Sequence, residues 1–145
     1  MDKKKFWIAF IVIFIVYEVT NFIVHGLILA PAYQSEELQS LFRPMDVLES
    51  TQWIRLFTEL VWSFFFTFIF VKGYENKGIM EGVKLGIYIG FFYSFVWAYQ
   101  TYWMYPFPYS LALQWFIYGF IQCVMLGILA TLIYKPKQII IPKNQ

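Results

Sequence analysis

The chain has 145 residues, of which 60% are apolar, 23% are aromatic and only 14% are charged. A soluble domain of this size has a large surface relative to its volume and needs more polar side chains to cover it. The composition therefore excludes an ordinary soluble domain, and a formal net charge of +2 gives no indication of nucleic acid as a partner.

Four apolar stretches follow one another along the chain. A helix rises about 1.5 Å per residue, so each stretch is long enough to cross a hydrocarbon core of about 30 Å. We predict transmembrane helices over residues 6–29, 53–71, 83–103 and 110–134. The expected fold class is all-α, a polytopic bundle of four transmembrane helices in a single membrane domain over residues 1–145.

The first stretch invites comparison with a signal peptide, because Lys3, Lys4 and Lys5 precede it. Its apolar part is too long for the apolar region of such a peptide, and no small-x-small cleavage site follows before His25. We therefore expect a retained first helix.

The connection over residues 31–51 is expected on the outer side of the membrane. Pro31 is predicted to end the first helix, since proline interrupts helical hydrogen bonding. Residues 35–42 are expected to form a short amphipathic turn at the interface. Asp46 followed by Glu49 fits a capping pattern, which predicts that the second helix begins there.

The basic residues indicate the orientation of the bundle. Nine of the eleven Lys and Arg residues fall on the side that holds both termini: Lys3, Lys4, Lys5, Lys72, Lys77, Lys84, Lys135, Lys137 and Lys143. The other side keeps Arg43 and Arg55. Basic residues near the ends of spans remain cytoplasmic, so both termini are predicted to be cytoplasmic, in the inner (cell) membrane.

Small residues recur every four positions on the last two helices. In lipid, such faces allow two helix backbones to approach closely and so drive helix association. The short loop between the helices favours pairing within one chain, although a homo-oligomer or a larger membrane complex uses the same kind of face. The predicted packing residues are Gly82, Gly86, Gly90, Gly119 and Gly127.

Polar residues inside the predicted spans are candidates for a site, because burying an ionisable group in a membrane costs several kcal/mol unless a partner compensates it. Glu18, Asn21 and His25 share one face of the first helix, and Arg55 and Glu59 are one turn apart on the second. The candidate residues for ligand binding or proton relay are Glu18, Asn21, His25, Arg55, Glu59, Gln100, Gln114 and Gln122.

The depths of these residues match across the helices. Glu18 and Gln122 lie at the midplane, Asn21 and Glu59 about 5 Å outward, and the others about 10 Å or more outward. We therefore expect a polar funnel that opens outside and narrows to Glu18. Arg55 can pair with either Glu59 or Glu18.

Two structural alternatives remain open at this stage. Arg55 and Glu59 form an interfacial ion pair equally well, and Gln100 and Gln114 can simply hold helices together.

Aromatic residues gather towards the outer boundary, as in the aromatic belts of many membrane proteins, but they also suit the mouth of a site for an amphiphilic or cationic ligand. They include Tyr33, Trp53, Trp97, Tyr99, Tyr102, Trp103, Tyr105, Tyr109 and Trp115.

No metal or cofactor is expected. The lone Cys123 and the lone His25 cannot build a disulfide or a two-histidine metal site within one chain. The chain contains no E-x-x-H pair, nucleotide-binding loop or hydrolase motif, which argues against a di-iron bundle and against the standard hydrolases.

The stretch Glu18-x-x-Asn21-x-x-x-His25-Gly26 and the turn over residues 72–84 resemble those of small bacterial four-helix membrane proteins of the domain-of-unknown-function kind. The resemblance spans most of the chain and implies the four-span layout, without an activity.

Three functional hypotheses follow. The first is a protein that binds or transports a small polar or amphiphilic ligand, with Glu18 as a proton-linked switch. The second is an accessory or structural membrane subunit. The third is an intramembrane enzyme that acts on a lipid, with Glu18, Glu59 and His25 as acid and base groups, and this one rests on fold-level analogy alone. The first is favoured, because intramembrane ionisable residues are functional by default.

Overall fold

The computed structural model describes residues 2–135, which are helical throughout apart from short turns. Helices account for 85% of the described residues, and no strand occurs among them. Four helices are long and apolar enough to cross a membrane: Lys3–Ile28, Gln52–Gly73, Ile79–Met104 and Tyr109–Tyr134. The predicted all-helical class is therefore correct, and each predicted span lies in one of these helices, apart from Leu29 at the end of the first.

Each long helix starts before its predicted stretch, and the second and third also end beyond it. α1 (Lys3–Asn21) begins among the lysines, where the side chain of Asp2 accepts a hydrogen bond from the backbone N–H of Lys5 at 3.2 Å. A short π-helical segment, η1 (Phe22–Ile28), extends α1. α5 (Gln52–Gly73) and α8 (Tyr109–Tyr134) are uninterrupted. The third long helix consists of α6 (Ile79–Gly90), the π segment η2 (Phe91–Phe95) and α7 (Val96–Met104).

The connection over residues 31–51 contains three short helices, α2 (Ala30–Tyr33), α3 (Glu36–Gln39) and α4 (Met45–Ser50). Two local expectations were wrong. Pro31 does not end the first helix but lies in the first turn of α2, where a proline needs no helical hydrogen bond. Asp46 does not cap the second long helix, since it lies in the first turn of α4 and α5 begins separately after Thr51.

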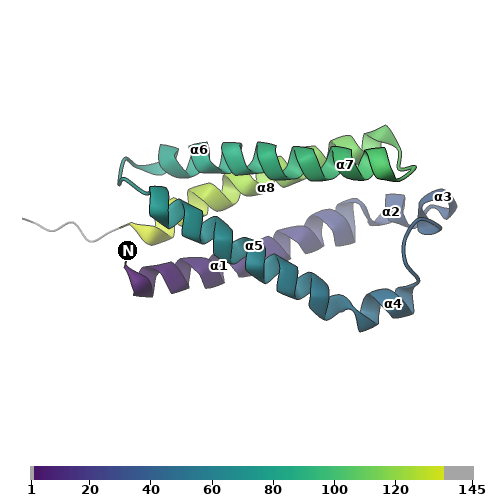
Figure 1. The fold of residues 1–145 in the computed structure, drawn as a ribbon, viewed down its shortest axis with the longest axis horizontal. Coiled ribbons are helices and arrows are strands. Elements are labelled where there is room, and N and C mark those ends of the chain that lie inside the picture. The colour runs from purple at the N-terminus through teal and green to yellow at the C-terminus, as the bar shows by residue number, and fades with distance from the viewer. Residues whose placement is uncertain (1, 136–145) are drawn as a thin grey trace, which may run out of the picture.

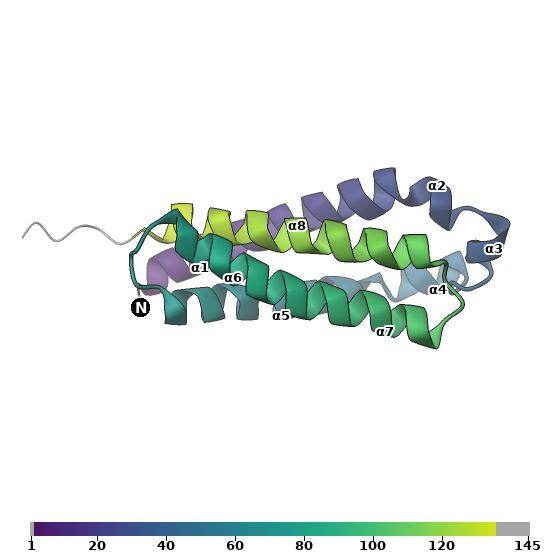
Figure 2. The ribbon, with the colours of Figure 1, turned by 90° about the horizontal axis from the view of Figure 1, so that it is seen from above.

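The chain ends of the described bundle meet at one end. The start of α1, the turn between α5 and α6 and the end of α8 lie together, and α2, α3 and α4 lie at the opposite end (Figures 1 and 2). We call these the N-terminal end and the connection end. The backbone N–H of Asp2 donates to the Tyr134 hydroxyl at 3.0 Å, which ties α1 to α8 at the N-terminal end. Lys137 and Lys143 lie outside the described residues.

The closest helix pair is α6 with α8. On α6, Gly82 faces Gly127 of α8, and Gly86 and Gly90 face Cys123. Gly119 of α8 faces Ser94 of η2. A Cβ added to Gly86 would lie 2.5 Å from Cα of Val124, which is backbone and cannot yield. The small-residue faces therefore bring these two helices together within the chain, as the sequence favoured. α1 packs against α5 and α8, whereas α5 meets α6 mainly near their connecting turn.

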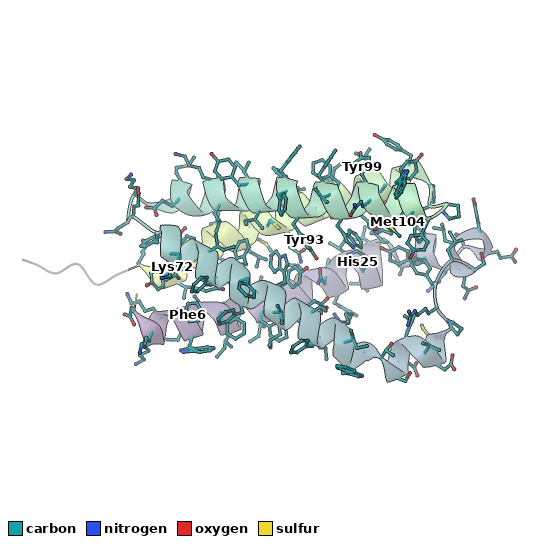
Figure 3. The ribbon with its side chains drawn as sticks, viewed as in Figure 1. Phe6, His25, Lys72, Tyr93, Tyr99 and Met104 are labelled. Carbon is teal, nitrogen blue, oxygen red and sulfur yellow. The ribbon has the colours of Figure 1, made fainter. Side chains whose placement is uncertain are left out.

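The interior at the N-terminal end is apolar. One cluster of buried side chains joins three of the long helices there, with Ile13 from α1, Phe66 and Phe70 from α5, and Leu126 from α8. The outer surface is apolar as well, since large side chains such as those of Phe92 and Trp103 are 72% and 82% exposed. Figure 3 shows side chains projecting outward along the bundle, from Lys72 at the N-terminal end to Met104 at the connection end.

Candidate functional site

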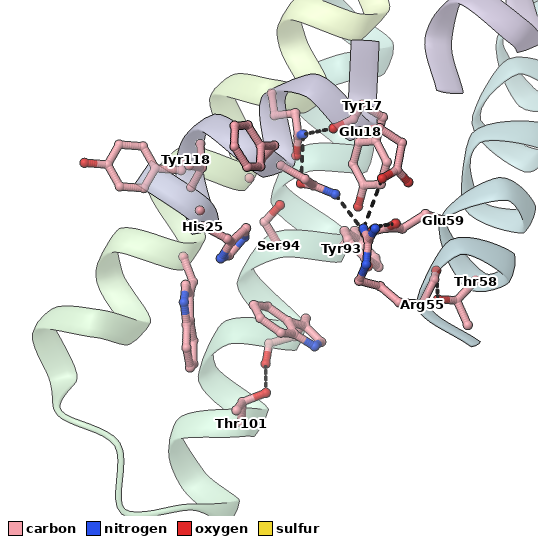
Figure 4. A pocket seen from close by; sticks show the side chains of 18 of the residues that line it. Tyr17, Glu18, His25, Arg55, Thr58, Glu59, Tyr93, Ser94, Thr101 and Tyr118 are labelled. Atoms are coloured by element: carbon pink, nitrogen blue, oxygen red, sulfur yellow. Dashed lines mark hydrogen bonds and ion pairs between the residues drawn. The ribbon is translucent and has the colours of Figure 1, made fainter. Parts of the chain in front are cut away.

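A partly open cavity of about 720 Å³ lies in the half of the bundle nearer the connection end. Its walls come from α1, η1, α5, η2, α7 and α8, with contributions from the connection and from the loop before α8. The volume falls within the range of small-molecule sites in proteins, about 300–1,000 Å³. Figure 4 shows the polar side chains that gather in it.

An ion triad of Glu18, Arg55 and Glu59 lies on one side of the cavity. Nη1 of Arg55 lies 3.0 Å from a carboxylate oxygen of Glu18 and 2.5 Å from one of Glu59. The sequence left open which carboxylate pairs with Arg55, and the structure shows that both do. The carboxylates are the more deeply placed members, since the side chains of Glu18 and Glu59 are 22% and 14% exposed and that of Arg55 is 46% exposed.

A chain of amide hydrogen bonds links this triad to α8. Nδ2 of Asn21 donates to Oε1 of Glu59 at 3.0 Å, and Nε2 of Gln122 donates to Oδ1 of Asn21 at 3.0 Å. The Gln122 amide also lies 2.5 Å from the Thr20 hydroxyl. The carboxylate of Glu59 therefore accepts a hydrogen bond from Asn21 of α1 as well as one from Arg55, and Gln122 holds the Asn21 amide in place.

A second polar group lies closer to the connection end. The Trp115 indole N–H donates to the Tyr33 hydroxyl at 2.7 Å, and the same hydroxyl lies 2.7 Å from Nδ1 of His25. The Tyr33 oxygen accepts the bond from Trp115, so the Tyr33 O–H can donate to Nδ1 of His25. A neutral imidazole that carries its proton on Nε2 fits this arrangement. Burial raises the pKa of Tyr33 to about 12, and the hydrogen bond from Trp115 offsets part of that rise.

Both π-helical segments contribute to the cavity. η1 supplies His25, and η2 supplies Tyr93 and Ser94. A π turn closes an i→i+5 hydrogen bond, as between the N–H of Leu29 and the carbonyl of Val24, and so holds one residue more than an α turn. The side chains in such a turn leave the regular α-helical spacing. Single-turn π segments within α-helices are frequent at functional sites.

Two buried polar atoms in the cavity walls have no hydrogen-bond partner among the described residues. They are Oε1 of Glu18 and the hydroxyl of Ser94, a residue that is only 3% exposed. An unsatisfied buried acceptor costs about 1–3 kcal/mol, so such atoms call for an explanation. Both atoms belong to residues that line the cavity.

Aromatic side chains form the wall at the connection end. We define this aromatic wall as Tyr33, Phe42, Trp97, Phe107 and Trp115, all of which line the cavity. The ring centroids of Trp97 and Phe107 lie 5.1 Å and 5.2 Å from that of Trp115. On the side of the N-terminal end, Tyr17 stacks on Trp62 at 4.4 Å, and Trp62 on Phe66 at 5.0 Å. The polar groups thus lie between two aromatic layers.

Of the eight predicted site residues, six line the cavity: Glu18, Asn21, His25, Arg55, Glu59 and Gln122. Gln100 and Gln114 do not line it. Gln100 is exposed on α7 and Gln114 is half-buried on α8, since their helical positions face away although their depth is suitable. His25 lines the cavity but bonds Tyr33 instead of the residues on its own face of α1, because η1 changes the spacing after Asn21.

Sequence reasoning missed Thr20, which bonds Gln122 of α8, and Ser94, which lines the cavity. A lone hydroxyl residue in a span gives no signal of its own, and Ser94 belongs to the small-residue pattern of its helix. The structure shows no cluster of three His, Cys, Asp or Glu residues that could hold a metal ion within residues 2–135. Cys123 is buried on α8 and is a free thiol.

Comparisons of the chain with family models, with curated proteins and with solved structures give no match. The resemblance to small bacterial four-helix proteins is therefore not supported by these comparisons, and the site has to be interpreted from its own geometry.

Proposed function

We propose that the protein spans the inner (cell) membrane four times and binds or transports a small polar or amphiphilic ligand in the cavity, with Glu18 as a proton-linked switch. The support for insertion is the apolar exterior of four helices, each long enough to cross a bilayer. The lipid bilayer is then the first partner of the chain.

The distribution of charge supports cytoplasmic termini. The N-terminal end carries Lys3, Lys4, Lys5, Lys72, Lys77, Lys84 and Lys135, whereas the connection end holds Arg43 among four acidic residues of α3 and α4. Lysines near the ends of spans resist translocation across the membrane. In this orientation the cavity lies in the outer half of the membrane, because its lining residues belong to the half of the bundle nearer the connection end.

The observation that carries the ligand-binding proposal is the combination of a cavity of suitable volume with unsatisfied polar atoms on residues of its walls. A bundle that only had to hold its helices together would place its polar atoms against each other, since each unpartnered one costs stability. Here Oε1 of Glu18 and the Ser94 hydroxyl have no such partner, although both residues line the cavity.

Native mass spectrometry of the protein purified in a mild detergent tests this proposal. We expect the wild-type protein to carry a small molecule that Glu18→Gln loses, because the amide keeps the shape of the side chain but removes its charge. Glu37→Gln, an exposed substitution of the same kind in α3, should retain the molecule. If wild type and Glu18→Gln carry the same set of bound species, the proposal is wrong.

A structural role for the ion triad is the second candidate, because Arg55 contacts both carboxylates and offsets part of their charge. In an accessory subunit the triad would serve only to join α1 to α5. The stability of variants of Arg55 and Glu18, argued in the Discussion, separates the two candidates.

A further inference from the structure

We propose that the ligand of this cavity is a hydrophobic organic amine, bound as its ammonium ion by Glu18 and Ser94 with its apolar part against the aromatic wall. This inference rests on the proposed function and specifies the chemical class of the ligand. It follows from three features of the cavity: its charge, its unpartnered acceptors and its aromatic wall.

The charge of the cavity favours a cation. Two carboxylates, Glu18 and Glu59, share a single guanidinium, that of Arg55. The lining also contains the imidazole of His25, whose bond with Tyr33 fits its neutral form. The lining therefore has one negative charge in excess when both carboxyl groups are ionised, and one bound monovalent cation makes it neutral.

The hydrogen bonds of the two carboxylates point to the position of that cation. Glu59 uses one oxygen for Arg55 and the other for Asn21, so it is satisfied by the protein. Glu18 uses Oε2 for Arg55, while its Oε1 is buried and unpartnered. An ammonium group supplies both the donor and the opposite charge that Oε1 lacks, which a hydroxyl or a carbonyl does not.

Ser94 provides a second acceptor from another helix. Its hydroxyl is buried in η2 and has no hydrogen-bond partner, and the residue lines the same cavity, so the lining offers one acceptor on α1 and a second on the third long helix. A simple metal cation fits less well, because it requires several oxygen ligands and no cluster of three acidic or histidine groups is present within residues 2–135.

The aromatic wall suits the rest of such a molecule. Trp97 and Phe107 each pack against Trp115, and the three rings offer apolar surface along the cavity, with faces that attract organic cations. The volume of about 720 Å³ exceeds that needed by a small ion and leaves room for an alkyl or aryl body. An amphiphile of this type also partitions into a bilayer, next to which the cavity lies.

Three probes with the same alkyl chain and different head groups test the inference. We would measure the binding of dodecylamine, dodecanol and dodecanoate at pH 7 to the protein in a non-ionic detergent, by native mass spectrometry. Dodecylamine should bind one molecule per chain, and it should bind at least about tenfold more tightly than the alcohol or the carboxylate, because a charge-assisted hydrogen bond is worth about 1.5–3 kcal/mol.

Variants locate the binding. Glu18→Gln should weaken dodecylamine binding at least about tenfold, and Glu37→Gln on the surface of α3 should leave it unchanged. Ser94→Ala should weaken it by a smaller factor, and this variant decides the matter if Glu18→Gln fails to fold, since alanine fits the same small position beside Gly119. Equal affinity for dodecylamine in wild type and in whichever of these variants folds would overturn the inference.

The probe series also separates this inference from the proposed function. If dodecanol or dodecanoate binds as tightly as dodecylamine, the amine class is wrong while ligand binding itself stands. If none of the three binds, the amine class is again wrong, and the molecule retained by the purified wild-type protein then decides the proposed function independently.

Discussion

At the scale of single residues, Arg55 has two counter-ions, and this governs how each member of the triad responds to replacement. Removal of Glu18 leaves Arg55 paired with Glu59, and removal of Glu59 leaves it paired with Glu18. Removal of Arg55 instead leaves two carboxylates facing each other without a cation. Breaking a buried pair costs about 3–5 kcal/mol, but water screens part of that here because the Arg55 side chain is 46% exposed.

We therefore expect Arg55→Gln to lower the free energy of unfolding by about 2 kcal/mol and Glu18→Gln to change it by less than about 1 kcal/mol. The double variant should recover most of the loss, since one carboxylate then remains among neutral donors. Denaturant unfolding in detergent measures all three. A Glu18→Gln variant that unfolds and is rescued by Arg55→Gln would favour the structural role of the triad over ligand binding.

Tyr33 provides a pH-dependent probe of the cavity from outside the spans. Burial raises its pKa from 10.0 to about 12, with a partial offset by the hydrogen bond from Trp115. The folded state thus holds the phenolic proton more tightly than the unfolded state does. The stability that this difference contributes is fully present below pH 10 and is lost as the pH rises through about 12.

The tyrosinate absorbance of the wild type minus that of Tyr33→Phe should accordingly titrate near pH 12, in a folded sample. The stability of the wild type should fall between pH 10 and 12 by more than that of the variant. A difference titration with its midpoint near pH 10 would show that Tyr33 is open to solvent and that its bonds to His25 and Trp115 are not formed in solution.

At the scale of helices, α6 and α8 form the rigid half of the bundle, and their contact depends on glycine. A Cβ at Gly86 would meet the backbone of Val124, so α6 would have to move away from α8. The contact also fixes η2 and the cavity residues Tyr93 and Ser94, because η2 directly follows α6. Loss of this contact should therefore affect the site as well as stability.

Gly86→Ala should lower the unfolding midpoint in a detergent melting assay, by an amount equivalent to about 1–3 kcal/mol, the usual cost of overpacking. The matched control is Gly73→Ala at the end of α5, where an added Cβ meets nothing within 4 Å. Leu85 lies off the small-residue face of α6, but it is unsuitable as a control because it packs against the apolar cluster at the N-terminal end. Equal melting of the two alanine variants would mean that α6 and α8 do not pack as described.

The sequence predicted elements better than it predicted local geometry. The apolar stretches predicted the four long helices, because a helix that can cross a membrane must be long and apolar. Both properties can be read directly from the sequence. The π segments η1 and η2 have no such signature, so the redirection of His25 towards Tyr33 could not be foreseen. Depth along a helix was predictable for Gln100 and Gln114, but the face each presents depends on how the helices are rotated against each other.

At the scale of the whole molecule, the two ends differ in chemistry. The N-terminal end is closed by an apolar core and ringed by lysines, and the connection end carries three short helices with acidic side chains and the aromatic wall. Alternation of apolar spans and basic flanks is visible in the sequence, which made this asymmetry predictable. The assembly of the cavity walls was less predictable, because contacts such as that of Trp115 with Tyr33 join residues far apart in the chain.

The proposed orientation gives the last prediction. Native Cys123 is 2% exposed, so a cysteine introduced on the surface should be the main reactive thiol of the protein. A cysteine at Glu37, which is exposed in α3, should react with a membrane-impermeant thiol reagent in intact cells. A cysteine at Glu75, whose side chain is 62% exposed in the turn between α5 and α6, should react only after the cells are opened. Glu75 is preferable to Asn76, which has a φ of 62° that favours asparagine over cysteine. The opposite labelling pattern would place the lysines outside and turn the cavity towards the cytoplasm, so any ligand would have to reach Glu18 from the cytoplasmic half of the membrane.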